Sequence, residues 1–293
     1  MMRRPDAQGG GFGPAPVTLR SQPFPEKLFN RVVRLQPQFN LLVHAVSQDT
    51  AFLREHLANA ALADADFTGR LLAIQEDVAS GALETRQKVV LGIHRSDYFA
   101  NMDPATGQVT GCKQIELNTI ASAFGCLSSR VTRMHQYLGS TGMKLKLAVG
   151  EDAPGDGDIR MANPVISNAE QCYANAIAQA FKAYTAQRPA APAVGGDCGV
   201  VGGGSGDEQQ EEVKEEVDPV VMIVVQPGEA NSGDQDIIRF NLWDRFGIRA
   251  VRHSLDDVHR TGSTRAADGA LIVAGREVAV AYFRAGYAPE DYR

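Results

Sequence analysis

Residues 219–251, PVVMIVVQPGEANSGDQDIIRFNLWDRFGIRAV, carry the clearest fold signal in this chain of 293 residues. Pro219 to Val225 is a short run of β-branched and other apolar residues, which is typical of a buried strand. Gln235 to Phe246 has apolar residues at helical spacing, and Gly247 is placed to end that helix. Ile248 to Val251 predicts a second strand, which completes a βαβ unit. The sequence therefore predicts an α/β protein.

Strands and helices also alternate outside this unit. Strands are predicted at Lys88 to Ile93 and Lys113 to Thr119, with turn residues between them, and a hairpin is predicted from Leu271 to Val273 and Glu277 to Phe283. Pro37 should kink or split the first helix. Helical spacing predicts helices at Glu26 to Gln48, from Asp49, from about Asp66, around Leu127 to Tyr137, and at Asn168 to Tyr184.

Two segments have too few large apolar residues to form a core. Residues 1–22 are rich in Gly, Pro and Gln, and residues 186–218 run from Pro and Ala through Gly into an acidic stretch. We expect a disordered tail at 1–22 and a disordered low-complexity insertion at 186–218. These segments divide the chain into an amino-terminal core at 23–185 and a second domain at 219–293, which the resemblance described below implies is a substrate-binding domain.

Charge and cysteine spacing exclude several classes of protein. The formal net charge is −6, and the segment from Asp207 to Asp218 alone sums to that value, so the rest of the chain is neutral. Nucleic-acid and membrane surfaces need clustered Lys and Arg, and none are visible. With no secretory signal and no apolar run of roughly 20 residues, a cytoplasmic location is expected. Free thiols are predicted because the four cysteines lie far apart: Cys112, Cys126, Cys172 and Cys198.

The strand predicted at 113–119 has one oxygen-rich face. Glu116 and Asn118 lie on that face, whereas Ile115 and Leu117 lie on the other, which we expect to face the core. A carboxylate and an amide carbonyl two residues apart on a rigid strand suit a hard cation such as Mg²⁺. The alternative is the solvated edge of an antiparallel sheet, which the spacing alone favours.

Arg95 directly follows the strand predicted at 88–93, where loops commonly present functional groups. Its guanidinium could bind a carboxylate through two parallel hydrogen bonds. The alternative is a surface ion pair between Arg95 and Asp97. His94 has no second histidine at ligand spacing, which favours a packed or exposed side chain over a metal ligand.

Polar residues follow the strand predicted at 219–225. In open α/β sheets, ligands bind beyond the carboxyl ends of the strands, so Glu229, Asn231 and Gln235 are well placed. The alternative is a polar turn in which Asp234 is the N-cap of the next helix.

The residues from Arg284 to Tyr287 hold the same position after the final strand. Gly286 permits close backbone approach and Arg284 offers an anion contact, although the quartet could also be a simple turn. The glycine-rich run at 202–206 is not a phosphate loop, because it does not join a strand to a helix. No catalytic residue is named, because no nucleophile and base can be paired from their spacing.

Taken in order, these segments resemble the eukaryotic glutathione synthetase family. The resemblance also includes FNLLV at 39–43, and its most specific stretches are LGIHRSDY at 91–98, KQIELNTI at 113–120 and YFRAGY at 282–287. It covers Pro23 to Arg293 apart from the insertion at 186–218. Members of this family have an ATP-grasp fold and act as homodimers.

The resemblance implies an incomplete ATP-grasp fold with a βαβ substrate-binding domain. The implied reaction is the ATP- and Mg²⁺-dependent ligation of γ-glutamylcysteine to glycine through an acyl phosphate, which gives glutathione, ADP and phosphate. It implies that Arg95 binds γ-glutamylcysteine, that Glu116 and Asn118 bind Mg²⁺, and that Glu116 also lies close to the nucleotide. The peptide pocket would be lined by Ile120, Ala121, Ser122, Ala123, Glu229, Ala230, Asn231, Gln235, Arg284, Ala285, Gly286 and Tyr287.

The chain departs from the family pattern at several positions. Ala121 and Ala123 stand where hydroxyls are expected, Ala230 replaces an arginine and Ala285 replaces an acid. The chain also stops at Arg293, before the family's remaining ATP-binding residues and lid. We therefore expect that it does not complete the reaction alone. Two alternatives stay open: a non-catalytic remnant that binds peptide or dimerises with a full-length subunit, and a ligase for another acceptor such as β-alanine or serine.

Overall fold

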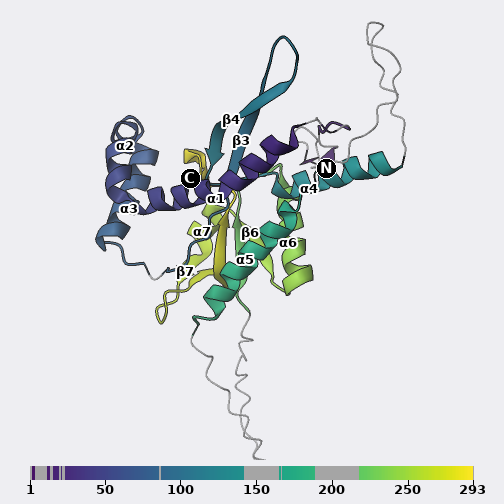
Figure 1. The fold of residues 1–293 in the computed structure, drawn as a ribbon. Helices are drawn as coiled ribbons and strands as arrows, with labels where there is room; N and C mark the ends of the chain where they lie inside the picture. The colour runs from purple at the N-terminus through teal and green to yellow at the C-terminus, as the bar shows by residue number, and fades with distance from the viewer. Residues whose placement is uncertain are drawn as a thin grey trace, which may run out of the picture.

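The computed structural model describes residues 2–3, 12–13, 16–19, 21, 24–85, 87–141, 165, 167–188 and 218–292. Helices pack on both faces of a mixed sheet, as expected for the α/β class (Figure 1). Most of the tail expected at 1–22 and of the insertion expected at 186–218 lies outside the described residues.

The helices are α1 Glu26–Gln48, α2 Thr50–Ala63, α3 Arg70–Ser80, α4 Gly125–Ser140, α5 Ala169–Thr185, α6 Ser232–Phe246 and α7 Leu255–Thr261, with a π-helical turn at Ala65–Gly69 and a 3₁₀ turn at Pro289–Tyr292. The strands are β1 Met2–Arg3, β2 Phe12–Gly13, β3 Arg95–Met102, β4 Val109–Asn118, β5 Val220–Val224, β6 Ala250–His253, β7 Gly262–Thr264, β8 Leu271–Val273 and β9 Arg276–Phe283. None of the described helices is long and apolar enough to cross a membrane.

The main sheet has five strands in the order β6-β5-β9-β8-β7. β5 lies between β6 and β9 and runs parallel to both, and Val221 pairs with Ala250 on one side and Val280 on the other. β8 is antiparallel to β9, which confirms the predicted hairpin. The βαβ unit predicted from residues 219–251 is therefore β5, α6 and β6.

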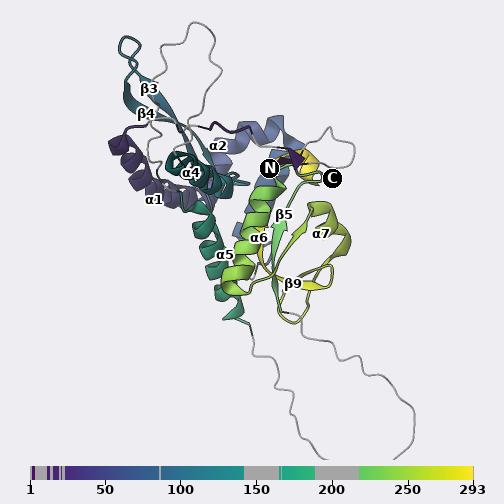
Figure 2. The same ribbon diagram turned by 90° about the vertical axis from the view of Figure 1, so that its right-hand side faces the viewer.

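The core forms on both faces of β5, whose residues are all buried. On one face, Val221 and Ile223 pack with Ile177 of α5 and Leu242 of α6. On the other face, Met222 and Val224 pack with residues of α7, β8 and β9. Figure 2 shows α5 and α6 on one side of the sheet and α7 on the other. This placement explains the continuous apolar run in β5, because a strand covered on both faces has no polar side.

β3 and β4 form a separate antiparallel hairpin that projects from the main body (Figure 1). The strand predicted at 88–93 is wrong: within the described residues that segment pairs with no strand, and β3 begins at Arg95. The core face expected for Ile115 is also wrong, because its side chain is 52% exposed. A two-stranded hairpin offers no second layer to cover such a residue.

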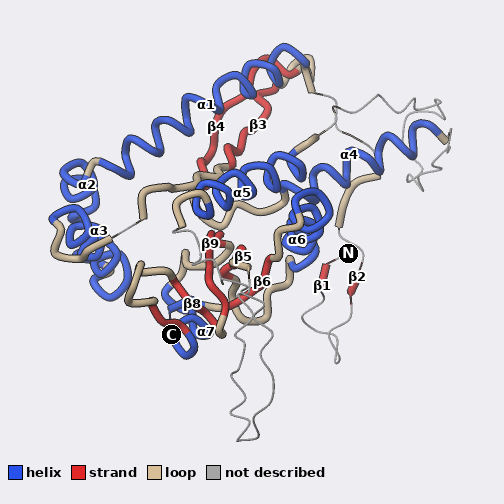
Figure 3. Tube along the Cα trace, turned by 90° about the horizontal axis from the view of Figure 1, so that it is seen from below, coloured by secondary structure: helices blue, strands red, loops and turns tan. Residues whose placement is uncertain are grey.

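Helices α1, α2 and α3 lie at the rim of the molecule and contain no buried residue (Figure 3). α1 runs unbroken through Pro37, so it is not split. Asp49 caps α2 as predicted, because its side chain accepts a hydrogen bond from Phe52 N at 2.9 Å. The sequence correctly predicted that these segments are helical, but the expectation that they pack into a core is wrong for this chain, because none of their residues is buried.

Candidate functional site

Four polar side chains share one face of the β3–β4 hairpin. Arg95 pairs with Asn118 across the two strands, and Asp97 pairs with Glu116, so all four lie on the same side. Arg95 Nε and Nη2 each donate to a carboxylate oxygen of Asp97 at 2.8 Å, and Nη2 lies 3.7 Å from Glu116 Oε1. The ion pair that the sequence left open as an alternative is therefore formed. Hydrogen bonds from Arg95 lower the pKa of Asp97, and the same bonds raise the pKa of Arg95.

The donor set on this face fits part of a magnesium site. Asn118 Nδ2 donates to Glu116 Oε1 at 3.0 Å, which leaves the amide carbonyl oxygen outside that contact. The Glu116 side chain is 56% exposed, so its carboxylate is accessible. Among the described residues, no group of three or more His, Cys, Asp or Glu side chains could hold a metal. Mg²⁺ usually takes one or two protein carboxylates and completes its shell with water and phosphate, so two protein oxygens are compatible with it.

The segment from Ile120 to Ala123 connects the hairpin to α4 in a strained conformation. Ala121 has φ +52 and Phe124 has φ +69, although neither is glycine. The buried Ser122 hydroxyl donates to Ile93 O at 3.3 Å and to Asn118 O at 3.1 Å. Arg95 Nη1 donates to Ala123 O at 3.4 Å. The expected substrate loop is thus tied to the base of the hairpin.

The other end of this loop is tied to α6 through Asp234. The N-cap of α6 is Asn231, so the alternative in which Asp234 caps its own helix is wrong. Its carboxylate instead accepts N–H groups at the start of α4, from Phe124 at 3.1 Å and from Cys126 and Leu127 at 3.0 Å each. Sequence reasoning missed this role. The available signal was the absence of a capping residue at α4, where Phe124 holds the N-cap position.

A buried polar cluster lies at the carboxyl ends of β5 and β9. Arg284 Nη1 donates to Asp234 Oδ2 at 3.0 Å, and their side chains are 2% and 0% exposed. Glu229 accepts Asn231 N at 2.6 Å and Gln235 Nε2 at 3.0 Å. Arg284 Nε, Gln235 Oε1 and Asn231 Nδ2 are buried without a hydrogen-bond partner in the described part of the chain. A buried polar atom left without a partner costs about 1–3 kcal/mol, so these three atoms are positions where water or a polar ligand would stabilise the fold.

The turn after β9 is held by a second buried acid. Gly286 has φ +98, a conformation in which other residues are strained. Asp291 Oδ2 accepts Gly286 N at 2.8 Å and Tyr287 N at 3.2 Å. Tyr287 OH donates to Gln226 Oε1 at 3.2 Å, which ties the turn to the segment after β5. Ala285 is buried, and Ala230 is partly buried in the turn before α6.

Tyr173 of α5 lies near both the hairpin residue Arg95 and the buried residue Arg284. Burial and the negative charge of Asp234 raise the pKa of Tyr173 to about 12, whereas the positive charges of Arg284 and Arg95 oppose the shift. Both arginines are therefore close enough to act on one phenol. The rings of Tyr173 and Tyr282 meet edge to face with their centroids 6.5 Å apart.

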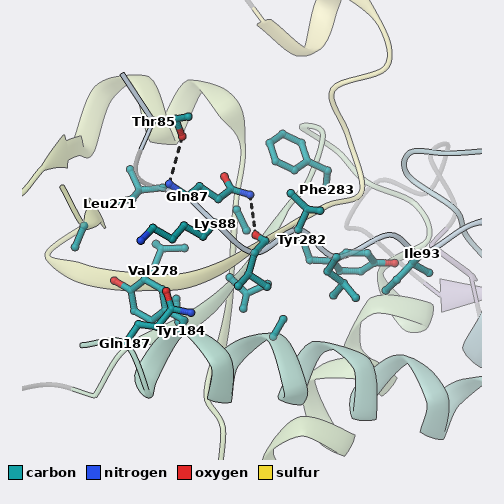
Figure 4. A pocket seen from close by; sticks show the side chains of 18 of the residues that line it. Thr85, Gln87, Lys88, Ile93, Tyr184, Gln187, Leu271, Val278, Tyr282 and Phe283 are labelled. Atoms are coloured by element: carbon teal, nitrogen blue, oxygen red, sulfur yellow. Dashed lines mark hydrogen bonds between the residues drawn. The ribbon is translucent and has the colours of Figure 1, made fainter. Parts of the chain in front are cut away.

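A cavity of about 960 Å³ borders this region. Its walls come from residues 87–91, from 119–122, from α5 and the residues after it, from 268–271 and from β9. Figure 4 shows Lys88 and Tyr184 toward one end of the cavity and Ile93 and Tyr282 toward the other. Ile120, Ala121 and Ser122 line it, whereas the polar cluster around Arg284 lies outside its walls.

The predicted site residues therefore fall into three connected groups. The hairpin brings together Arg95, Glu116 and Asn118, and the ends of β5 and β9 bring together the groups at 229–235 and 284–287. The loop 120–123 joins them through Arg95 on one side and Asp234 on the other.

Comparisons with known proteins give matches over most of the chain. The family model described as eukaryotic glutathione synthase, ATP binding domain, matches residues 1–264. Glutathione synthetase of Dictyostelium discoideum is 31% identical over 278 residues, which are 94% of this chain and 49% of that protein. The Homo sapiens glutathione synthetase is 33% identical over 282 residues, with 95% and 48% covered. The chloroplastic glutathione synthetase of Solanum lycopersicum is 34% identical over 278 residues, with 95% and 42% covered.

A solved structure has a similar fold. The apoform of a glutathione synthetase-like effector from Globodera pallida matches with a TM-score of 0.59 and 19% identity, over 92% of this chain and 50% of that one. At this identity the match shows the fold alone. The chain spans about half the length of the curated relatives it matches.

Proposed function

The chain belongs to the eukaryotic glutathione synthase family, and on this premise we propose that it binds γ-glutamylcysteine and serves its ATP-dependent ligation to glycine. The products of that reaction are glutathione, ADP and phosphate. The observation that carries the proposal is the buried cluster at the ends of β5 and β9, where Arg284, Gln235 and Asn231 retain unpaired hydrogen-bonding atoms among the described residues.

The chemistry of this cluster matches the peptide. γ-Glutamylcysteine carries carboxylates at both ends and an ammonium group on the glutamyl residue. The buried guanidinium of Arg284 suits a carboxylate, and the carboxylate of Glu229 suits an ammonium group. Gln235 and Asn231 supply amides for the remaining polar atoms. These groups are already held by contacts within the chain, so few side chains have to be ordered on binding, but the cover over them must open to admit the peptide.

The polar face of the β3–β4 hairpin would bind Mg²⁺ next to the ATP phosphates. Glu116 and Asn118 supply the oxygen donors for Mg²⁺, and Glu116 would lie close to the nucleotide. When bound, Mg²⁺ would neutralise negative charge on the ATP phosphates. Arg95 has two N–H groups beyond those that bind Asp97 and Ala123, and these could contact a carboxylate of the peptide.

The reaction class explains why cations and exclusion of water are needed. A carboxylate is a poor electrophile, so ATP converts it to an acyl phosphate, and the amine of glycine then displaces phosphate. Arg95 and Arg284 would hold the peptide and offset the negative charge around the reacting carboxylate. Burial of the cluster would protect the acyl phosphate from hydrolysis.

Other parts of the proposal rest on the family. We propose an ATP-grasp fold, a homodimer, a cytoplasmic location and a peptide pocket that includes residues 120–123, 229–231, 235 and 284–287. We also propose that 23–185 and 219–293 are the two structural units of the chain. The alternative of a non-catalytic remnant is not favoured, because the curated relatives described above are named glutathione synthetases.

Calorimetry with γ-glutamylcysteine tests the proposal. Wild-type protein should bind, and Gln235→Leu, which removes a buried amide at similar volume, should weaken binding at least tenfold, or about 1.4 kcal/mol. Arg95→Ala should also weaken it. Asn241→Leu is the matched control, because it removes an amide from the same helix where the side chain bonds only Ile237 O.

Three results would count against the proposal. Absence of binding by the wild type would overturn the substrate. If Gln235→Leu binds γ-glutamylcysteine as tightly as wild type, the β5–β9 cluster does not bind the peptide. If Arg95→Ala binds as tightly as wild type, Arg95 does not bind the peptide, and the cluster is unaffected by this result.

A further inference from the structure

We infer that Asp234 is a positioning residue of the proposed peptide site, where it fixes the substrate loop and the guanidinium of Arg284 in one arrangement. This inference rests on the proposed function and assigns a role to a residue outside the expected pocket. Asp234 stands in the first turn of α6, yet it contacts residues that are 50 to 110 positions away in sequence.

The carboxylate of Asp234 is fully occupied by these contacts. Oδ1 accepts the N–H groups of Cys126 and Leu127, while Oδ2 accepts Phe124 N and Arg284 Nη1. A carboxylate offers about four acceptor positions, so four donors use its capacity. The residue is 0% exposed. Asp234 therefore has no free position for a ligand and acts through the groups that it holds.

The first of these groups is the loop before α4. The loop is flanked by Ala121 and Phe124, which both have positive φ, and such residues cost about 1–3 kcal/mol each unless the surroundings hold them. Ser122 and Arg95 hold its hairpin end, and Asp234 holds its α4 end through Phe124 N. Loss of the α4 contacts would let Phe124 relax and would displace the residues at 120–123.

The second group is Arg284. Its Nη1 is bound to Asp234, and its Nε is buried without a partner among the described residues. Asp234 thus compensates the buried positive charge of Arg284 and fixes the position of its guanidinium, next to the phenol of Tyr282. Without this acid, a guanidinium whose side chain is 2% exposed would be uncompensated and would turn toward water.

The variant Asp234→Asn tests both contacts at constant size. One oxygen becomes an amide N–H₂, which would face either Phe124 N and Arg284 Nη1 or the N–H groups of Cys126 and Leu127, so in both orientations donors oppose each other. We expect faster amide hydrogen exchange at residues 120–127 and at least tenfold weaker binding of γ-glutamylcysteine. The far-UV circular dichroism should be unchanged at a temperature well below the unfolding midpoint.

Asp236→Asn is the matched control. Asp236 lies two residues further along α6 and makes a surface ion pair with Arg239 at 2.9 Å, so its substitution should change neither exchange at 120–127 nor peptide affinity. Weaker binding by both variants would point to a general charge effect and would overturn the inference.

The remaining outcomes are also decisive. If Asp234→Asn is folded and binds the peptide as tightly as wild type, the inference fails while the proposed function stands. If wild type does not bind at all, both fail. If Asp234→Asn does not fold, the wild type still provides a test, because γ-glutamylcysteine should slow exchange of the Phe124, Cys126 and Leu127 amides. Unchanged exchange on binding would overturn the inference.

Discussion

Gly125, the first residue of α4, allows the ring of Tyr173 to reach the centre of the site. A Cβ at this position would lie 2.6 Å from Tyr173 Cε2 and 2.7 Å from Cζ. Alanine normally improves a helix by up to about 1 kcal/mol relative to glycine, but overpacking costs about 1–3 kcal/mol. We therefore predict that Gly125→Ala lowers the free energy of unfolding by about 1–2 kcal/mol in urea titrations.

Gly111→Ala provides the matched comparison. Gly111 lies in β4, and nothing stands within 4 Å of a Cβ built there. This variant should stay within about 0.5 kcal/mol of wild type. If both variants have the same stability, the contact between Tyr173 and Gly125 does not constrain the site.

Single residues also show where sequence reasoning ends. Gln235, Asn231 and Arg284 could be proposed from their position after strands, and in the structure Gln235 and Arg284 are buried while Asn231 is partly buried. Asp234 could not be assigned, because a helix-capping acid is expected to serve its own helix. Its actual partners lie 107 to 110 residues earlier in the chain and, for Arg284, 50 residues later, and no local pattern indicates such contacts.

Helices of similar apolar character differ greatly in what they bury. Leu242 of α6 is 0% exposed in the core against β5, whereas Leu62 of α2 is 82% exposed. We predict that Leu242→Ala lowers the free energy of unfolding by about 2–5 kcal/mol, because it leaves a cavity. Leu62→Ala should change it by less than about 0.5 kcal/mol in the same titrations.

A comparable loss from Leu62→Ala would contradict this interpretation. It would show that the apolar stripe of α2 is covered in solution by another copy of the chain. Both variants should be measured over a tenfold range of protein concentration. Stability gained by association depends on concentration, whereas the stability of a single folded chain does not.

A helix or strand could be predicted where its hydrophobic pattern matches the faces that the neighbouring elements cover. β5 is buried on both faces and reads as a continuous apolar run, and α6 ends at Gly247, which has φ +66. The segment 88–93 has the same kind of composition but no neighbouring strand, so it remains an extended loop with Val90 60% exposed. β propensity shows only that side chains suit a half-buried sheet surface. The residues of the segment itself do not show whether a partner strand lies beside it.

At the scale of the whole molecule, the sheet and α5 enclose several weak acids. Burial raises the pKa of Cys126 from 9.0 to about 12, with a further contribution from the charge of Asp234. Burial likewise raises the pKa of Tyr173 and Tyr184 from 10.0 to about 12 each, and that of Tyr282 in the same direction. The folded state therefore keeps these protons at a pH where the unfolded chain loses them.

The sign of the resulting pH dependence follows from proton counting. Between about pH 9 and pH 12 the unfolded chain binds fewer protons than the folded chain, so the free energy of unfolding falls as pH rises. For Cys126, which is 0% exposed, the loss is about 1 kcal/mol by pH 10. Urea titrations at about pH 7.5, 9 and 10 should show decreasing stability.

Cys126→Ala should be less stable at about pH 7.5 but should lose less stability between that pH and about pH 10. An identical slope in both proteins would mean that this thiol ionises as readily in the folded core as in water.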